Sequence, residues 1–147
     1  MNNLYNLRKA IPNDFEFIKQ AKIHNIFAYA KEMSVEEKED IISYVGRYVN
    51  KYFNDYQIIE KDGVICGVVL VIDYEDGFVI DELYLTENYR NLGIGTDIIS
   101  NLTKQYDKLY LWVYKKNLRA FKLYEKLNFK IIDEREQHFI MLHNKNN

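Results

Sequence analysis

The sequence contains one cysteine, Cys66, and one proline, Pro12. A single cysteine excludes an internal disulfide and suits a reducing compartment. Because Cys66 lies in a β-branched run, we expect a buried, inert thiol. No stretch approaches the roughly 18 apolar residues of a membrane-spanning helix, and the N-terminus lacks the basic-then-apolar layout of a signal peptide. We therefore expect a cytoplasmic protein with no membrane partner.

Neither sign of charge dominates the chain. It has 20 lysines and arginines against 22 aspartates and glutamates, a net charge of -2. This balance gives no general reason to expect nucleic acid as a partner. The three histidines show no metal-binding spacing, so no metal is expected. The 147 residues predict a single domain, residues 1–147. The sequence leaves open whether the protein is a monomer or a homodimer.

Apolar periodicity and turn residues predict an α/β fold (α+β by some schemes). Strands are expected over residues 4–10, 56–60, 64–74, 78–85, 109–113, 129–132 and 138–142. Helices are expected from residue 13 or 14 to about 30, and over 35–52, 94–106 and 118–127. Ser34 and Glu37 have capping-box spacing. The order β-α-α-β-β-β-α-β-α-β-β gives a central, mixed but mostly antiparallel sheet of about seven strands, flanked by four helices. Its strand-helix-strand step over 78–113 should be parallel.

One stretch organises the rest of the chain. The strand over 78–85 is followed by Arg90-Asn91-Leu92-Gly93-Ile94-Gly95, which has the form R-x-x-G-x-G, and by a helix that begins inside this turn. Glycines allow close backbone approach and positive φ, and the first helical N–H groups have no partner within the helix. The helix dipole and Arg90 add positive charge. These features predict a site for a diphosphate.

Two common phosphate motifs do not fit this stretch. The dinucleotide motif G-x-G-x-x-G fails at its third glycine position, which is Ile98. A P-loop fails because no Gly-Lys-Ser/Thr follows. An NAD-type oxidoreductase is therefore disfavoured.

Two motifs in the right order resemble the GNAT superfamily of N-acetyltransferases. Leu83-Tyr84-Leu85, Tyr89-Arg90 and Gly93-Ile94-Gly95 are similar to its acetyl-CoA motif. The stretch from Asn117 to Phe129 is similar to its second motif, N-x-x-A-x-x-x-Y-E-K-x-G-F. The chain departs from that motif at Asn128, where the family commonly has glycine, although asparagine also accepts the left-handed conformation. The resemblance implies a GNAT-like fold and an N-acetyltransferase that uses acetyl-CoA as acyl donor.

The resemblance also implies a set of cofactor-binding residues. In the family, the backbone of the strand ending at Leu85 pairs with the pantetheine arm, and main-chain N–H groups of the turn hold the pyrophosphate. Lys115, Lys116, Arg119, Lys122 and Lys126 form a basic cluster, of which one or two could meet the 3′-phosphate of coenzyme A. Carried onto this sequence, the cofactor-binding residues are Leu83, Tyr84, Leu85, Arg90, Asn91, Leu92, Gly93, Ile94, Gly95, Thr96, Asn117, Ala120, Phe121, Tyr124 and Lys126.

The expected catalytic residues are Tyr124, Glu82 and Asp81. Tyr124 resembles the family's general acid, which protonates the departing thiolate. Asn117, matched to a family residue that binds cofactor or orders water, could equally be a helix N-cap. The amine nucleophile must lose a proton, and a carboxylate is the usual acceptor. Alternation along the strand points Asp81 and Glu82 to opposite faces unless a bulge intervenes, and Glu82 is favoured with Asp81 close behind.

The acceptor amine is the least determined part of the prediction. In the family, acceptor specificity comes from the first two helices and the last strands. Here these offer Phe27, Tyr29, Glu32, Tyr48 and Glu134, which together we call the acceptor wall. Acidic and aromatic residues favour a cationic amine such as a polyamine, an aminoglycoside or a lysine-like compound, and a peptide N-terminus stays open. The alternative to an enzyme is a non-catalytic GNAT-like module that binds acyl-CoA.

Overall fold

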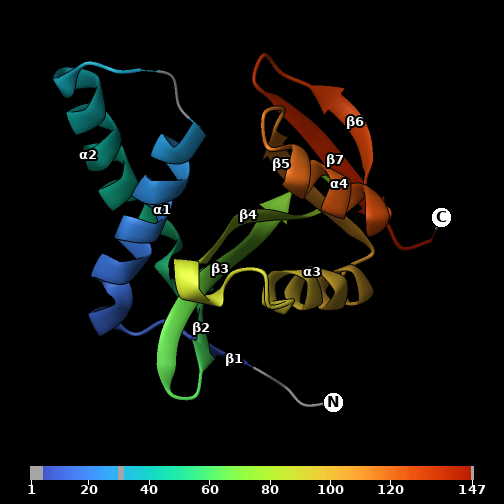
Figure 1. The fold of residues 1–147 in the computed structure, drawn as a ribbon, viewed down its shortest axis with the longest axis horizontal. Helices are drawn as coiled ribbons and strands as arrows, with labels where there is room; N and C mark the ends of the chain where they lie inside the picture. The colour runs from blue at the N-terminus through green and yellow to red at the C-terminus, as the bar shows by residue number, and fades with distance from the viewer. Residues whose placement is uncertain (1–4, 30–31, 147) are drawn as a thin grey trace. The chain divides into compact units, whose positions relative to one another are not determined.

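The computed structural model describes residues 5–29 and 32–146. In these residues the helices and strands follow the expected order (Figure 1). The helices are α1 (Phe15–Tyr29), α2 (Val35–Tyr52), α3 (Ile94–Gln105) and α4 (Leu118–Lys126). The strands are β1 (Asn6–Lys9), β2 (Tyr56–Lys61), β3 (Val64–Tyr74), β4 (Gly77–Leu85), β5 (Lys108–Tyr114), β6 (Lys130–Glu134) and β7 (His138–Asn144).

The seven strands form one sheet in the order β1-β2-β3-β4-β5-β7-β6. β1, β2 and β3 pair antiparallel, as do β5, β7 and β6. β4 pairs with β5 in parallel, at Phe78, Val79 and Ile80. The predicted mixed, mostly antiparallel sheet and its parallel step are therefore confirmed.

Several predicted boundaries differ from the structure. The last two strands are Lys130–Glu134 and His138–Asn144, so β6 begins one residue later than expected and both strands run further. Three short 3₁₀ helices, Pro12–Asp14, Phe53–Asp55 and Glu87–Tyr89, have no periodic pattern long enough to predict them. Leu4 and Ala30, expected in the first strand and first helix, lie outside the described residues.

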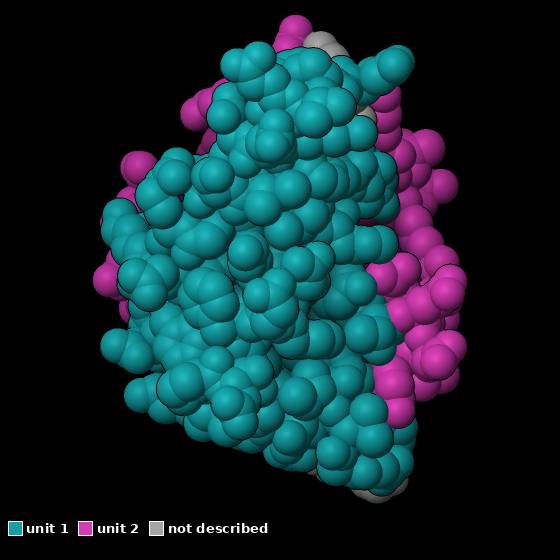
Figure 2. Space-filling model, turned by 90° about the vertical axis from the view of Figure 1, so that its left-hand side faces the viewer, with its two compact units in different colours: residues 1–70, 82–86 teal, residues 71–81, 87–147 magenta. Residues whose placement is uncertain are grey.

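The chain forms two compact units, which are coloured separately in Figure 2. Unit 1 comprises residues 1–70 and 82–86, and unit 2 comprises residues 71–81 and 87–147. The division falls within β3, after Leu70, and within β4, after Asp81. Asp81 and Glu82 are therefore neighbours in sequence that belong to different units.

Unit 1 packs α1 and α2 together with β1, β2 and parts of β3 and β4. The predicted capping box is confirmed, since Glu37 N donates to Ser34 Oγ and Ser34 N donates to Glu37 Oε1. Ile18 of α1 and Val45 and Val49 of α2 are fully buried. Helical spacing also predicts Ile42 on the apolar face of α2, but Ile42 is 39% exposed.

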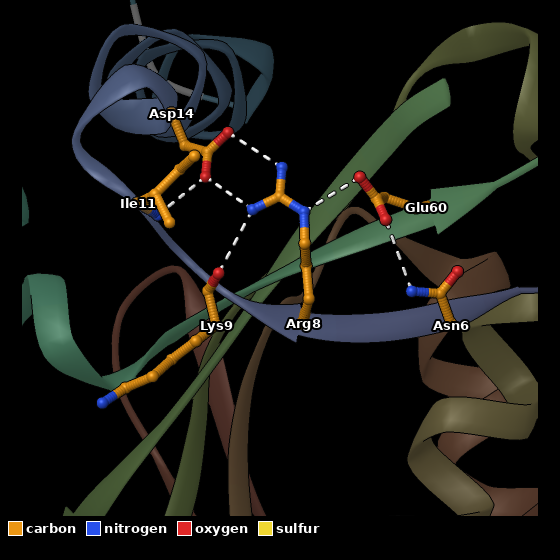
Figure 3. Close-up of polar contacts among 6 residues, drawn as sticks. All are labelled: Asn6, Arg8, Lys9, Ile11, Asp14 and Glu60. Carbon is orange, nitrogen blue, oxygen red and sulfur yellow. Dashed lines mark hydrogen bonds and ion pairs between the residues drawn. The ribbon is translucent and has the colours of Figure 1, made fainter. Parts of the chain in front are cut away.

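Arg8 joins three segments of unit 1 (Figure 3). Its guanidinium donates to both oxygens of Asp14, at 2.8 and 3.1 Å, and to Glu60 Oε2 at 2.9 Å. The Ile11 N–H donates to Asp14 Oδ2 at 2.8 Å. These bonds hold β1, the turn before α1 and β2 together, and they hold the pKa of the buried Asp14 carboxyl below its usual range.

Unit 2 contains α3, α4 and the strands β5, β6 and β7. The predicted apolar face of α3 is confirmed, with Ile94, Ile98 and Ile99 buried. Asn128 has φ 71°, the left-handed conformation expected after α4. The Phe129 N–H donates to Tyr124 O and the Phe129 side chain is buried, so this turn fixes the end of the second motif.

Candidate functional site

The turn before α3 has the backbone conformation of an anion cradle. Gly93 is the N-cap of α3 with φ 87°, and Asn91 has φ 62°. Among the described residues, no side chain caps this helix start, in contrast to Ser34 at α2. A Cβ built at Gly93 would meet no described atom within 4 Å, so the glycine faces open space. The first-turn N–H groups of α3 are therefore placed to bind an external acceptor.

Arg119 of α4 brings a second positive charge to this turn. Its Nη2 donates to Asn91 Oδ1, so the guanidinium is held at the residue two positions before Gly93. Arg90 lies in the turn itself and is exposed. The cradle, defined here as residues 90–96, thus combines helical N–H groups with two arginines from different elements, a combination suited to phosphate.

The start of α4 shows one of the two roles expected for Asn117, and its role toward the cofactor stays a prediction. Asn117 Oδ1 accepts a hydrogen bond from the Ala120 N–H at 3.2 Å, which makes Asn117 the N-cap of α4. Tyr124 lies two turns further along the helix, half-buried, with its ring centroid 5.9 Å from that of Phe129. Phe121 packs against Phe139 of β7 at 5.4 Å. The second motif is thus a short helix anchored by its cap and by these ring contacts.

The remaining basic residues near α4 differ in their surroundings. Lys115 pairs with Glu134 at 2.5 Å. Lys116, Lys122 and Lys126 are exposed. In the predicted basic cluster, Arg119 therefore contacts the cradle. Lys115 instead forms an ion pair with Glu134, a residue of the predicted acceptor wall.

In unit 1, β3 approaches the end of β4 closely. A Cβ added at Gly67 would overlap the carbonyl oxygen of Tyr84 and contact Leu85, so only glycine fits there. The Thr86 N–H donates to Cys66 O at 2.9 Å, and Cys66 is buried as predicted. The segment Leu83–Leu85, which the resemblance assigns to the pantetheine arm, is therefore fixed from the β3 side.

Glu82 is buried in unit 1 and engaged by two side chains of α1. It is 6% exposed, and its Oε1 lies 3.2 Å from Lys22 Nζ. Asn25 Nδ2 donates to Oε2. Lys22 as a residue is 8% exposed, and its Nζ also lies 3.9 Å from the centroid of the Tyr48 ring, a cation–π contact. Sequence reasoning missed Lys22 and Asn25, and it placed Tyr48 only as part of an acceptor wall.

Two tyrosine hydroxyls accompany this ion pair. Tyr48 Oη and Tyr56 Oη are buried, and among the described residues neither has a hydrogen-bond partner. Burial and, less strongly, the negative charge of Glu82 raise the pKa of Tyr56. Tyr56 therefore stays a neutral phenol beside Lys22 and Glu82.

A cavity of about 490 Å³ opens in unit 1 between α1 and β4. Its lining residues are Phe17, Gln20, Ala21, Ile23, His24, Phe27, Ala28 and Tyr84. The Tyr84 ring meets His24 at 5.4 Å and Phe17 at 6.4 Å between centroids, both edge-on. Phe27, predicted in the acceptor wall, thus lines a cavity. Tyr29 and Glu32, which follow it in the sequence, are exposed and are not among the lining residues.

The described residues contain no group of three or more His, Cys, Asp or Glu side chains that could hold a metal ion. None of the helices in the described part of the chain has the length and apolarity to cross a bilayer.

Comparison with known proteins gives a consistent set of relatives. Residues 16–129 match the sequence profile of the acetyltransferase (GNAT) family. N-alpha-acetyltransferase 50 of Danio rerio is 27% identical over 129 residues, which cover 83% of this chain and 74% of the relative.

Solved structures with the same fold include two coenzyme A complexes. PaiA N-acetyltransferase from Thermoplasma acidophilum, in complex with coenzyme A, has a TM-score of 0.73 at 21% identity. The match covers 95% of this chain and 98% of that one. Spermidine N-acetyltransferase from Vibrio cholerae, with CoA and spermine, has a TM-score of 0.67 at 19% identity, with coverage of 99% of this chain and 98% of that one. At these identities the likeness concerns the fold.

Proposed function

Because the chain belongs to the acetyltransferase (GNAT) family, we propose that it transfers the acetyl group of acetyl-CoA to a primary amine. The whole chain, residues 1–147, acts as one N-acetyltransferase domain in this proposal. The observation that carries it is the cradle: a left-handed Gly93 at the uncapped start of α3, with Arg119 held at Asn91. Helical N–H groups and arginines in this arrangement suit the pyrophosphate of coenzyme A.

Acetyl-CoA would supply the acetyl group as a thioester. The N–H groups over residues 91–96 would hold its pyrophosphate, with Arg90 and Arg119 as counter-charges. The backbone of Leu83–Leu85 would bind the pantetheine arm, as an extended chain binds a strand. Ala120, Phe121 and Lys126 of α4 complete the proposed cofactor set.

Tyr124 is proposed to hold the proton that the departing thiolate takes. A phenol and a thiol have reference pKa values of about 10 and about 8.5, so this transfer is not steep in either direction. The amine attacks the thioester carbonyl directly, a C–N bond forms as the C–S bond breaks, and no covalent intermediate with the protein is proposed.

Asp81 and Glu82 remain the candidates for removing the proton of the acceptor ammonium. The surroundings of Glu82 argue for Asp81, because a proton on Glu82 would leave the buried Lys22 ammonium without its counter-charge. An uncompensated buried charge of this kind costs about 3–5 kcal/mol. Asp81 is half-buried rather than buried. We therefore assign proton removal to Asp81 and the positioning of Lys22 and Asn25 to Glu82.

The acceptor is a primary amine, and the sequence favours small cationic amines such as polyamines, aminoglycosides or lysine-like compounds. The fold shared with a spermidine N-acetyltransferase supports that class only weakly. A peptide N-terminus is the other class, and the similarity to an N-alpha-acetyltransferase supports it.

A thiol-release assay with acetyl-CoA and a panel of amines, together with calorimetry of coenzyme A binding, tests the proposal. We expect coenzyme A to bind and at least one amine to release thiol. In Gly93→Val, a β-branched residue at φ 87° is strained and coenzyme A binding should be lost. Gly46→Ala is the matched control, because Gly46 lies in α2 with no described atom within 4 Å of an added Cβ. Unchanged binding in Gly93→Val would reject the cradle.

A further inference from the structure

The cavity of unit 1 is built almost entirely from one helix and one strand residue. Seven lining residues come from α1, and the eighth is Tyr84 of β4. Six of the eight are apolar or aromatic: Phe17, Ala21, Ile23, Phe27, Ala28 and Tyr84. Its volume, about 490 Å³, falls in the range of small-molecule sites. The cavity therefore has the size and the wall chemistry to hold an apolar group.

The polar groups of the cavity do not suit a polycation. Gln20, His24 and the hydroxyl of Tyr84 are the polar groups among the eight lining residues, and no carboxylate is among them. A polyamine or aminoglycoside would bring several positive charges to walls that offer no counter-charge. The edge-on rings of Tyr84, His24 and Phe17 instead match the contacts that an aromatic or branched aliphatic group makes.

The position of Tyr84 connects the cavity to the reaction. Tyr84 lies within Leu83–Leu85, the segment proposed to bind the pantetheine arm. Tyr84 also follows Glu82 by two residues and Asp81, the proposed base, by three, so all three lie in one short stretch of β4. A group in the cavity would thus lie against the strand that carries the thioester arm.

We propose that this cavity binds an aromatic or branched aliphatic group next to the reacting nitrogen of the acceptor. The acceptor is then a primary amine with such a group a few atoms from its nitrogen, either a free alkylamine or a peptide N-terminus with a large apolar first residue. This inference rests on the proposed acetyl transfer and names its substrate class.

The first experiment compares acceptors that share a primary amine and differ in the attached group. Thiol release is measured with 2-phenylethylamine, 3-methylbutylamine, ethylamine and spermidine. We expect kcat/KM for the first two to exceed that for ethylamine at least about tenfold, the discrimination that an apolar pocket achieves. Spermidine as the better acceptor would overturn the inference. Short peptides that begin with Phe or Gly then distinguish a peptide N-terminus from a free alkylamine as the acceptor. Only an enzyme that acts on peptides should prefer the Phe peptide over 2-phenylethylamine.

The second experiment changes the cavity wall. In Phe17→Ala, KM for 2-phenylethylamine should rise at least about fivefold, while KM for ethylamine and the affinity for coenzyme A stay within twofold. Phe15→Ala is the matched control, because Phe15 is also a half-buried phenylalanine of α1 and packs on Phe53 rather than on the cavity. If Phe17→Ala folds poorly, Ala28→Leu provides a second test. Ala28 is an exposed position on the cavity wall, and a larger side chain there should raise the same KM. An equal loss of coenzyme A affinity in Phe17→Ala would assign the cavity to the pantetheine arm and overturn the inference.

A binding measurement separates this inference from the proposed function. Binding of 2-phenylethylamine to the wild type is measured without acetyl-CoA by NMR chemical-shift changes, in parallel with Phe17→Ala. Binding that the variant weakens supports the cavity assignment, and absence of thiol release would then reject acetyl transfer alone. Thiol release without preference for apolar amines would keep acetyl transfer and reject the cavity assignment.

Discussion

Lys22 of α1 places its ammonium 3.2 Å from Oε1 of Glu82 in the interior of unit 1. Two charges removed from water are costly, and the pair persists because Asn25 and the Tyr48 ring complete its surroundings. A buried pair of this kind is weak evidence for stability, but its contacts join α1 to β4. It fixes β4 at the residue that precedes the proposed pantetheine strand.

Removing one member of this pair should destabilise the protein strongly. In Lys22→Met the Glu82 carboxylate loses its counter-charge, and we expect the free energy of unfolding in urea to fall by about 3–5 kcal/mol. Lys19→Met, on the same helix, should change it by less than about 0.5 kcal/mol. The double variant Lys22→Met/Glu82→Gln should recover part of the loss, since no charge is left uncompensated. Equal losses in Lys22→Met and Lys19→Met would contradict the buried pair.

Tyr124→Phe tests the proposed general acid. The variant keeps the ring that packs on Phe129 and removes only the hydroxyl. We expect kcat to fall about 10²–10⁴-fold with coenzyme A affinity within twofold of the wild type. Tyr106→Phe is the control, because Tyr106 is likewise half-buried against a phenylalanine, Phe78, in unit 2. A kcat that is unchanged in Tyr124→Phe would remove Tyr124 from this role.

Arg119→Gln tests the charge held at the cradle. Loss of one charge-assisted phosphate contact should raise the Kd for coenzyme A about tenfold and make binding less dependent on salt. Lys122→Gln removes an exposed charge from the same helix and should leave Kd within about twofold. Calorimetry at two salt concentrations measures both variants. If the two variants weaken binding equally, the effect is general attraction and not a contact made by Arg119.

The cradle and the order of elements could be predicted because they depend on local sequence. Gly93 and Asn128 are residue types that accept positive φ, and they mark the start of α3 and the end of α4. The apolar period of α3 and the capping box of α2 are likewise local patterns. Each of these signals lies within about one turn of the feature that it specifies.

The surroundings of Glu82 could not be predicted in the same way. Lys22 and Glu82 are 60 residues apart, and a lysine side chain ordinarily faces solvent. Lys22 follows Ile18 by four residues and therefore lies on the same side of α1 as that buried isoleucine. This spacing places Lys22 toward the interior, but helical periodicity alone does not identify the carboxylate that it meets.

The acid sensitivity of unit 1 should depend on Asp14. The Arg8 guanidinium, first of all, lowers the pKa of this carboxyl in the folded state. Its stabilising contribution is therefore present above the unfolded pKa of about 3.9 and is lost as pH falls through the lower folded value. Asp14→Asn should reduce the free energy of unfolding by about 3 kcal/mol at pH 7, and the difference from the wild type should shrink below about pH 4.

Asp62→Asn is the control, because Asp62 is an exposed aspartate at a left-handed position that asparagine accepts. This change should lower the free energy of unfolding by less than about 1 kcal/mol both at pH 7 and below about pH 4. Urea unfolding of the three proteins between pH 3 and pH 7 measures these differences, and a pH-independent loss in Asp14→Asn would mean that the Asp14 carboxylate charge does not contribute.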